Sequence, residues 1–230
     1  MTPTDELVAK IRSRGYWTVR IHPSTYDAER IGRLSALERA VSDSSVALRG
    51  WSFPHYDSVH SPVRSANYVE QPTEWQHALE LWRAYKSGQF LSLVGFMEDW
   101  RDQSSFWLAD AGWEPGASLG VESTIFRFVE VYEFAARWSR ALGLEGRIVV
   151  ELSLRGLEDR FLALSPARLP LLPARLCTAA EWSQSESYDS SELFTETRKL
   201  AVAPAQSLFE LFGWDASHEM VREIQAELRG

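Results

Sequence analysis

Two histidines and a carboxylate lie close together in the segment 50–72. His55, Asp57 and His60 fall within six residues, and imidazole and carboxylate groups serve both as metal ligands and as proton carriers. These three side chains could therefore bind a metal ion or supply a general base oriented by an acid. Their spacing matches neither the helical HExxH arrangement nor a zinc finger. The simpler interpretation is that they hydrogen-bond the loop and shape its turns.

A second group of acids follows an apolar run. Residues 89–97 are mostly apolar, and we expect them to form a central strand buried on both faces. Glu98, Asp99 and Asp102 come directly after this run. Carboxylates at the carboxyl end of a strand are well placed to bind a divalent metal or to transfer protons. Arg101 lies among them, however, and solvated acids are common where a helix begins.

Aromatic residues are concentrated in two segments that we expect to be ordered loops, 50–72 and 98–120. The chain contains ten Trp in 230 residues, several times the usual share. Such rings can fill the interior of a loop, form the centre of a protein–protein interface or stack on flat ligands. A cleft lined by both loops would favour ligand binding or catalysis. The rings that could form a binding surface are Trp51, Phe53, Trp100, Trp107 and Trp113.

Other residues and motifs that commonly serve in catalysis or cofactor binding are not evident in the sequence. The single Cys177 has no neighbouring histidine to lower the pKa of its thiol, and it cannot form an internal disulfide. The sequence contains no phosphate-binding loop, dinucleotide fingerprint, nucleophile elbow or CxxC pair. We therefore predict no cofactor.

Composition limits the partners. The chain has 24 basic and 32 acidic residues and a formal net charge of −8, so duplex nucleic acid is not an expected partner. Its 45% hydrophobic and 24% charged residues are typical of a soluble globular protein. The first 15 residues resemble no secretory signal, and no apolar run is long enough to cross a membrane. We expect a cytoplasmic protein.

Hydrophobic periodicity predicts alternating helices and strands. Thr73 and Gln76 fit a capping box that would open one of the helices, and Ser217 is the expected cap of the last one. The helices are expected at 5–14, 27–40, 73–87, 122–142 and after the Ser-rich segment 183–191, and the strands at 16–21, 46–49, 89–97, 147–154, 161–164 and 176–184.

These elements indicate one α+β domain spanning residues 1–230. The strands at 147–154 and 161–164 are predicted to form a hairpin, within an antiparallel meander at the C-terminal edge of a mixed sheet. The helix at 122–142 has the widest apolar face, and we expect it to pack across the sheet with the C-terminal helices. Residues 165–174 contain three prolines and form a stiff connector.

Three segments resemble landmarks of an uncharacterised family of bacterial proteins: LRGWSFPHYD (48–57), LELWRAYKSGQFLSLVGFMEDW (79–100) and LFELFGWD (208–215). The resemblance implies a bacterial, intracellular protein and no particular activity. Our first hypothesis is a non-catalytic module that binds a protein partner, or a second copy of itself, through the Trp-rich loops. The alternatives are a metal-dependent hydrolase or nuclease that uses the acids and histidines above, and a regulatory domain that binds a nucleotide or another small ligand.

Overall fold

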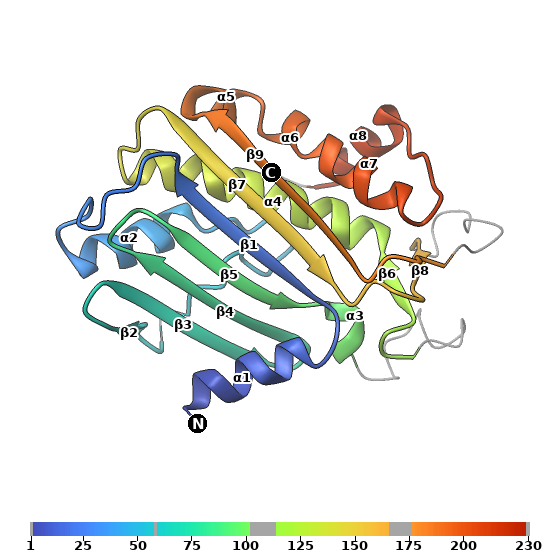
Figure 1. Ribbon diagram of the computed structural model, residues 1–230, viewed down its shortest axis with the longest axis horizontal. Helices are drawn as coiled ribbons and strands as arrows, with labels where there is room; N and C mark the ends of the chain where they lie inside the picture. Colours follow the sequence, from blue (N-terminus) through green and yellow to red (C-terminus); the bar gives the residue numbers. More distant parts are fainter. Residues whose placement is uncertain (1, 58, 102–113, 166–175, 229–230) are drawn as a thin grey trace.

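A seven-stranded antiparallel sheet forms the centre of the computed structural model (Figure 1). The model describes residues 2–57, 59–101, 114–165 and 176–228. The strands of this sheet are β1 (Tyr16–Pro23), β2 (Val63–Arg64), β3 (Tyr68–Trp75), β4 (Ala78–Tyr85), β5 (Phe90–Gly95), β7 (Arg147–Arg155) and β9 (Glu181–Asp189). They lie in the order β2-β3-β4-β5-β1-β7-β9. Two short strands, β6 (Ser118–Gly120) and β8 (Phe161–Ala163), form a separate parallel pair.

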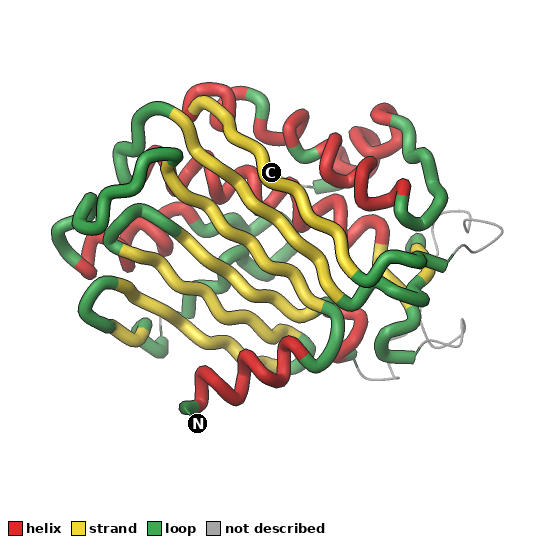
Figure 2. The backbone as a smooth tube through the Cα atoms, in the orientation of Figure 1, coloured by secondary structure: helices red, strands yellow, loops and turns green. Residues whose placement is uncertain are grey.

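Helices cover the two faces of the sheet unequally (Figures 1 and 2). They are α1 (Pro3–Arg12), α2 (Leu34–Ser44), α3 (Met97–Trp100), α4 (Val121–Ala141), α5 (Ser190–Thr195), α6 (Thr197–Leu200), α7 (Val202–Glu210) and α8 (His218–Ala226). α4 crosses the back of the sheet, with α2 and the C-terminal helices beside it on the same side. α1 lies on the front, over β3, β4 and β5. The predicted α+β domain with a long packing helix is confirmed.

The main core lies between α4 and the sheet. Phe128, Tyr132 and Trp138 project from α4 and are almost completely buried. The rings of Phe90 and Phe134 meet there at 4.4 Å between centroids. A second, smaller core lies under α1 and contains Leu7, Ile11, Leu79, Leu81 and Leu93. β4 and β5 are therefore buried on both faces.

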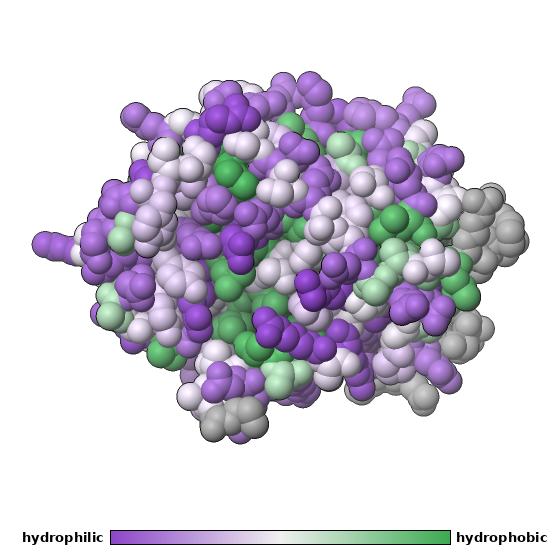
Figure 3. All heavy atoms as spheres, in the orientation of Figure 1, coloured by the Kyte–Doolittle hydropathy of each residue, from purple (hydrophilic) through white to green (hydrophobic). Residues whose placement is uncertain are grey.

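The front of the sheet is open where α1 does not cover it. The register places Thr18, Ser153 and Ser183 side by side across β1, β7 and β9. Arg20 and Glu151 form an ion pair at 3.0 Å in the next row. Figure 3 shows hydrophilic residues spread over much of this face, with smaller hydrophobic areas between them. None of the described helices combines the length and the apolar character that crossing a membrane requires.

The helix predicted at 73–87 is wrong, because this segment forms most of the β3–β4 hairpin. Trp75, Leu79 and Trp82 have helical spacing in the sequence. β4 packs against a core on each face, so buried and exposed residues do not alternate along it. The turn at Gln76 has a φ of 51° without a glycine, so the usual hairpin signal is missing. Thr73 is a strand residue and caps nothing.

Four other elements differ from the sequence-based expectation. Val46 pairs only with Phe53, so 46–49 is not a strand. β8 pairs with β6 and does not return along β7, because the nine-residue β9 occupies the whole edge of β7. The last strand runs from Glu181 through the Ser-rich segment, and the second helix begins at Leu34 rather than near residue 27. The proline-rich connector lies almost entirely outside the described residues.

Candidate functional site

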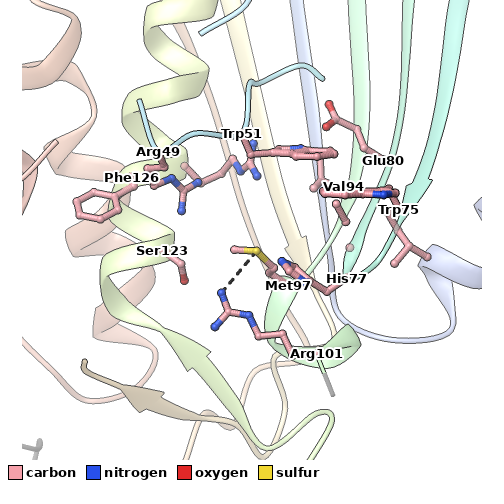
Figure 4. Close-up of a pocket in the computed structure, with 14 residues that line it drawn as sticks. Arg49, Trp51, Trp75, His77, Glu80, Val94, Met97, Arg101, Ser123 and Phe126 are labelled. Atoms are coloured by element: carbon pink, nitrogen blue, oxygen red, sulfur yellow. Dashed lines mark hydrogen bonds between the residues drawn. The ribbon is translucent and has the colours of Figure 1, made fainter. Parts of the chain in front are cut away.

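A cavity of about 400 Å³ lies between the back of the sheet and the first turns of α4 (Figure 4). This volume falls within the range of about 300–1,000 Å³ that is typical of small-molecule sites. β4 and β5 form one wall, and the segment before Phe53 forms another. The lining residues are Arg49, Trp51, Trp75, His77, Ala78, Leu79, Glu80, Val94, Gly95, Met97, Arg101, Ser123, Phe126 and Arg127.

Two parallel indole rings form a flat wall of the cavity. The rings of Trp51 and Trp75 lie 5.3 Å apart between centroids with an interplanar angle of 4°. The His55 imidazole stacks on Trp51 at 3.9 Å. Burial lowers the pKa of His55, against the opposing attraction of Asp57, so the stacked imidazole is neutral at pH 7. Trp75 is 56% exposed, which leaves this wall accessible from solvent.

The segment that presents Trp51 is held at several points. Backbone hydrogen bonds of 2.8 Å join Val46 and Phe53 in both directions. Phe53 is fully buried and meets Phe134 edge to face. The indole N–H of Trp82 donates to the carbonyl of His55 at 2.7 Å. These contacts, made by a strand and a helix distant in sequence, hold the loop and the indole at the mouth of the cavity.

A group of three charged residues, the Arg49–Arg127–Glu130 group, lies at the α4 side of the cavity. Arg49 donates to both carboxylate oxygens of Glu130, at 2.8 and 2.7 Å. Nη1 of Arg127 lies 3.3 Å from Glu130 Oε2 but makes no hydrogen bond to any described residue. The side chains are 21%, 13% and 1% exposed, in that order. Two guanidinium groups thus share one carboxylate, and Glu80 and Glu98 attract Arg127 as well.

Glu80 is a buried carboxyl group in the cavity wall. Its residue is 1% exposed. It accepts two long hydrogen bonds of 3.3 Å, from the backbone N–H of His55 and from the hydroxyl of Ser92. Burial raises the pKa of Glu80 to about 7, although the positive charge of Arg127 opposes this rise. Near neutral pH this carboxyl group is therefore divided between its neutral and its ionised form.

Glu98 and Asp99, predicted as possible catalytic acids, are engaged in structural contacts. Glu98 Oε1 accepts from the N–H of Gly120 at 3.1 Å and from the Ser123 hydroxyl at 2.6 Å. This carboxylate thereby caps the first turn of α4. Asp99 binds the guanidinium of Arg160 with both oxygens, at 2.8 and 2.6 Å. It also accepts from two backbone N–H groups at 2.9 Å, so its acceptor sites are occupied. Asp102 lies outside the described residues.

The predicted histidine group is only partly assembled. The imidazole of His60 hydrogen-bonds Asp57 at 2.6 Å, and this bond is the main reason that the pKa of Asp57 is lowered. His55 instead stacks on Trp51. Among the residues that the model describes, no group of three or more His, Cys, Asp or Glu side chains could hold a metal ion.

The five predicted aromatic binding residues have different surroundings. Trp51 lines the cavity, whereas Phe53 belongs to the core. Trp100 packs beside the second core, with the guanidinium of Arg14 over its ring at 4.3 Å. Trp107 and Trp113 lie outside the described residues. Cys177 is buried, and burial raises the pKa of its thiol, which keeps it in the unreactive protonated form.

The sequence interpretation missed three residues of the cavity, Arg49, Glu80 and Arg127. Glu80 lies among apolar residues of a segment predicted as a helix, and Arg127 lies within the helix predicted at 122–142. A charge inside an apolar run was the available signal, because buried charges require partners. The two Trp-rich segments meet at the cavity through one residue each, since Trp51 of 50–72 and Arg101 of 98–120 both line it.

Comparison with known proteins found no family model, curated protein or solved structure that matches this chain. The resemblance to an uncharacterised bacterial family stays a prediction.

Proposed function

We propose that this protein binds a small anionic ligand with a flat apolar part in the cavity between the sheet and α4. The observation on which the proposal depends is the buried guanidinium of Arg127, which shares Glu130 with Arg49 and has an Nη1 without a hydrogen bond to any described residue, beside a pair of parallel indole rings. A buried charge without a full counter-charge is costly. An anionic group on a ligand would offset that cost.

The apolar part of the ligand has a matching surface. The Trp75 ring stacks on Trp51 and is 56% exposed, so it offers a flat face to an aromatic ring. Stacking of this kind contributes about 1–3 kcal/mol per base in nucleic-acid complexes. Val94, Met97 and Phe126 extend the apolar lining. Guanidinium groups bind carboxylate, sulfonate and phosphate oxygens in a planar arrangement. Aromatic carboxylates, aromatic sulfonates and nucleoside monophosphates all satisfy these requirements.

Thermal-shift measurements with four compounds test the proposal. They are naphthalene sulfonate, adenosine monophosphate, inorganic phosphate and the uncharged naphthalene sulfonamide. We expect the aromatic anions to raise the melting temperature most, because a ligand at 100 times its Kd adds about 2.7 kcal/mol. Phosphate and the sulfonamide each supply only half of the recognition and should give smaller shifts.

Two cavity variants and one control assign the site. Arg127→Met removes the guanidinium that faces the ligand but leaves Arg49 paired with Glu130, and Trp51→Ala removes the ring on which Trp75 stacks. Both should abolish most of the shift. Phe194→Ala removes an exposed ring that lies under Arg140, away from the cavity, and should change nothing. If no aromatic anion stabilises the protein, or if Arg127→Met binds like the wild type, the proposal is wrong.

A second proposal is the non-catalytic module that binds a protein partner. Its support is the 56% exposure of Trp75, since exposed Trp residues are frequent centres of interfaces. Affinity capture with the wild type, Trp75→Ala and Phe194→Ala, each checked for a native melting profile, tests it. A partner that is lost only with Trp75→Ala supports this reading, and identical captures by all three proteins contradict it.

A further inference from the structure

Anionic groups in the cavity compete for the positive charge of Arg127. In the Arg49–Arg127–Glu130 group, two guanidinium groups share one carboxylate. Glu80 and Glu98 also attract Arg127. Glu98 is hydrogen-bonded at the start of α4, whereas Glu80 has no ion-pair partner among the described residues. Once ionised, Glu80 is an anion that Arg127 attracts within the cavity. An anionic ligand at the same place would be attracted in the same way, and two anions buried in one cavity would repel each other.

The other polar groups around Glu80 act on its ionisation in opposite directions. Glu130, on α4, repels its negative charge. The N–H of His55 and the hydroxyl of Ser92 stabilise that charge through two long hydrogen bonds. His77 and Arg101 line the opposite side of the cavity (Figure 4), and Glu98 lies behind Ser123. Burial is the main reason that the pKa of Glu80 rises to about 7, and Arg127, His55 and Ser92 limit the rise; from this value a ligand can shift the pKa in either direction.

We propose that the ligand of this cavity is an aromatic monoanion, and that Glu80 enters the complex as a neutral carboxylic acid that hydrogen-bonds the ligand. This inference rests on the proposed function. Its chemical consequence is that binding takes up one proton wherever Glu80 is ionised in the free protein. Glu80 therefore determines specificity: at high pH its own charge excludes anions, and the cavity then prefers an uncharged ligand of the same shape.

The pH dependence of affinity tests this inference. Naphthalene sulfonate is the probe because its charge does not change between pH 6 and pH 8.5, in contrast to a phosphate monoester. For the wild type we expect Kd to be constant at acid pH and to rise, in the limit, about tenfold for each pH unit above about 7. Calorimetry in two buffers of different ionisation enthalpy should show an uptake approaching one proton per ligand at pH 8.5. The uncharged naphthalene sulfonamide should show neither effect.

Single substitutions identify the residue that takes up the proton when the ligand binds. E80Q keeps the hydrogen-bonding shape without the charge, and its Kd should stay at the acid-limit value of the wild type at every pH. E74Q, on the exposed end of β3, should retain the wild-type slope. A protonated histidine would produce a pH dependence of the same sign, so H77Q is measured as well and should also retain the slope. Each variant is first shown to melt cooperatively.

The outcomes separate the two proposals. If wild type binds the sulfonate with the same Kd from pH 6 to pH 8.5, or if E80Q keeps the slope, the inference about Glu80 is wrong while the ligand-binding function stands. If H77Q alone loses the slope, the proton belongs to His77 and the inference is again wrong. If neither aromatic anion binds at any pH, the proposed function fails, and this inference fails with it.

Discussion

Replacing Asp99 with Asn tests whether burial makes an ion pair essential in this fold. The residue is 1% exposed, its side chain is fully buried, and the side chain of Arg160 is 3% exposed. The guanidinium donates to both Asp99 oxygens, and the N–H groups of Gly15 and Gly116 donate to the same carboxylate. An Asn amide would turn an N–H toward one of these donors. It would also leave the charge of Arg160 buried without a counter-charge.

The magnitude follows from that geometry. Removing one partner of a buried pair costs about 3–5 kcal/mol, against a total stability of roughly 5–15 kcal/mol for a domain. Lys10 and Glu74 provide the comparison, because their N–O distance of 2.5 Å is close to the 2.6 Å of the buried pair. Their side chains are 44% and 51% exposed, so Glu74→Gln should cost less than about 1 kcal/mol.

Urea unfolding followed by Trp fluorescence and circular dichroism measures both effects. We expect Asp99→Asn to lower the midpoint strongly at an unchanged slope. A double variant, Asp99→Asn with Arg160→Met, should recover part of the loss because it removes the stranded charge. The reasoning is refuted if Asp99→Asn and Glu74→Gln have equal effects. A stable Asp99→Asn protein would also restore Asp99 as a candidate for chemistry.

Three further predictions concern stability. The pKa of Glu80 is raised in the folded protein from its ordinary value of 4.5 to about 7. Its contribution to the free energy of unfolding is therefore full below about pH 4.5 and declines as the pH rises to about 7. The wild type should therefore lose roughly 3 kcal/mol of unfolding free energy over that pH range, as measured by urea unfolding at each pH. Glu80→Gln should not show this loss, and a wild-type pH profile in this variant would contradict the assignment. Glu98→Ala uncaps α4 and should cost about 1 kcal/mol in thermal unfolding; a wild-type melting temperature would show that this cap is dispensable. Gly15→Ala would force a methyl group into the Phe96 ring and should cost about 1–3 kcal/mol, whereas Gly32→Ala meets no atom within 4 Å and should be nearly neutral.

The elements that were predictable have local signals. α4 was evident from its long helical periodicity, and its Glu133–Arg137 pair forms at 3.2 Å. β1 and β7 alternate cleanly because α1 leaves most of their front face open to solvent. Ser217 caps α8 as predicted, because a side-chain cap involves only neighbouring residues. For these segments the nearest residues in the chain supply most of the determining interactions.

The sequence by itself determined the class of the fold, its longest helix and the presence of one Trp-rich segment beside a possible site. Tertiary structure alone decided that β4 is a strand, because two cores on opposite faces conceal its alternation. It also decided that Arg49, Glu80 and Arg127 meet at one cavity. Buried charges are stable only beside partners, and here those partners come from a loop, a strand and a helix that are far apart in the chain.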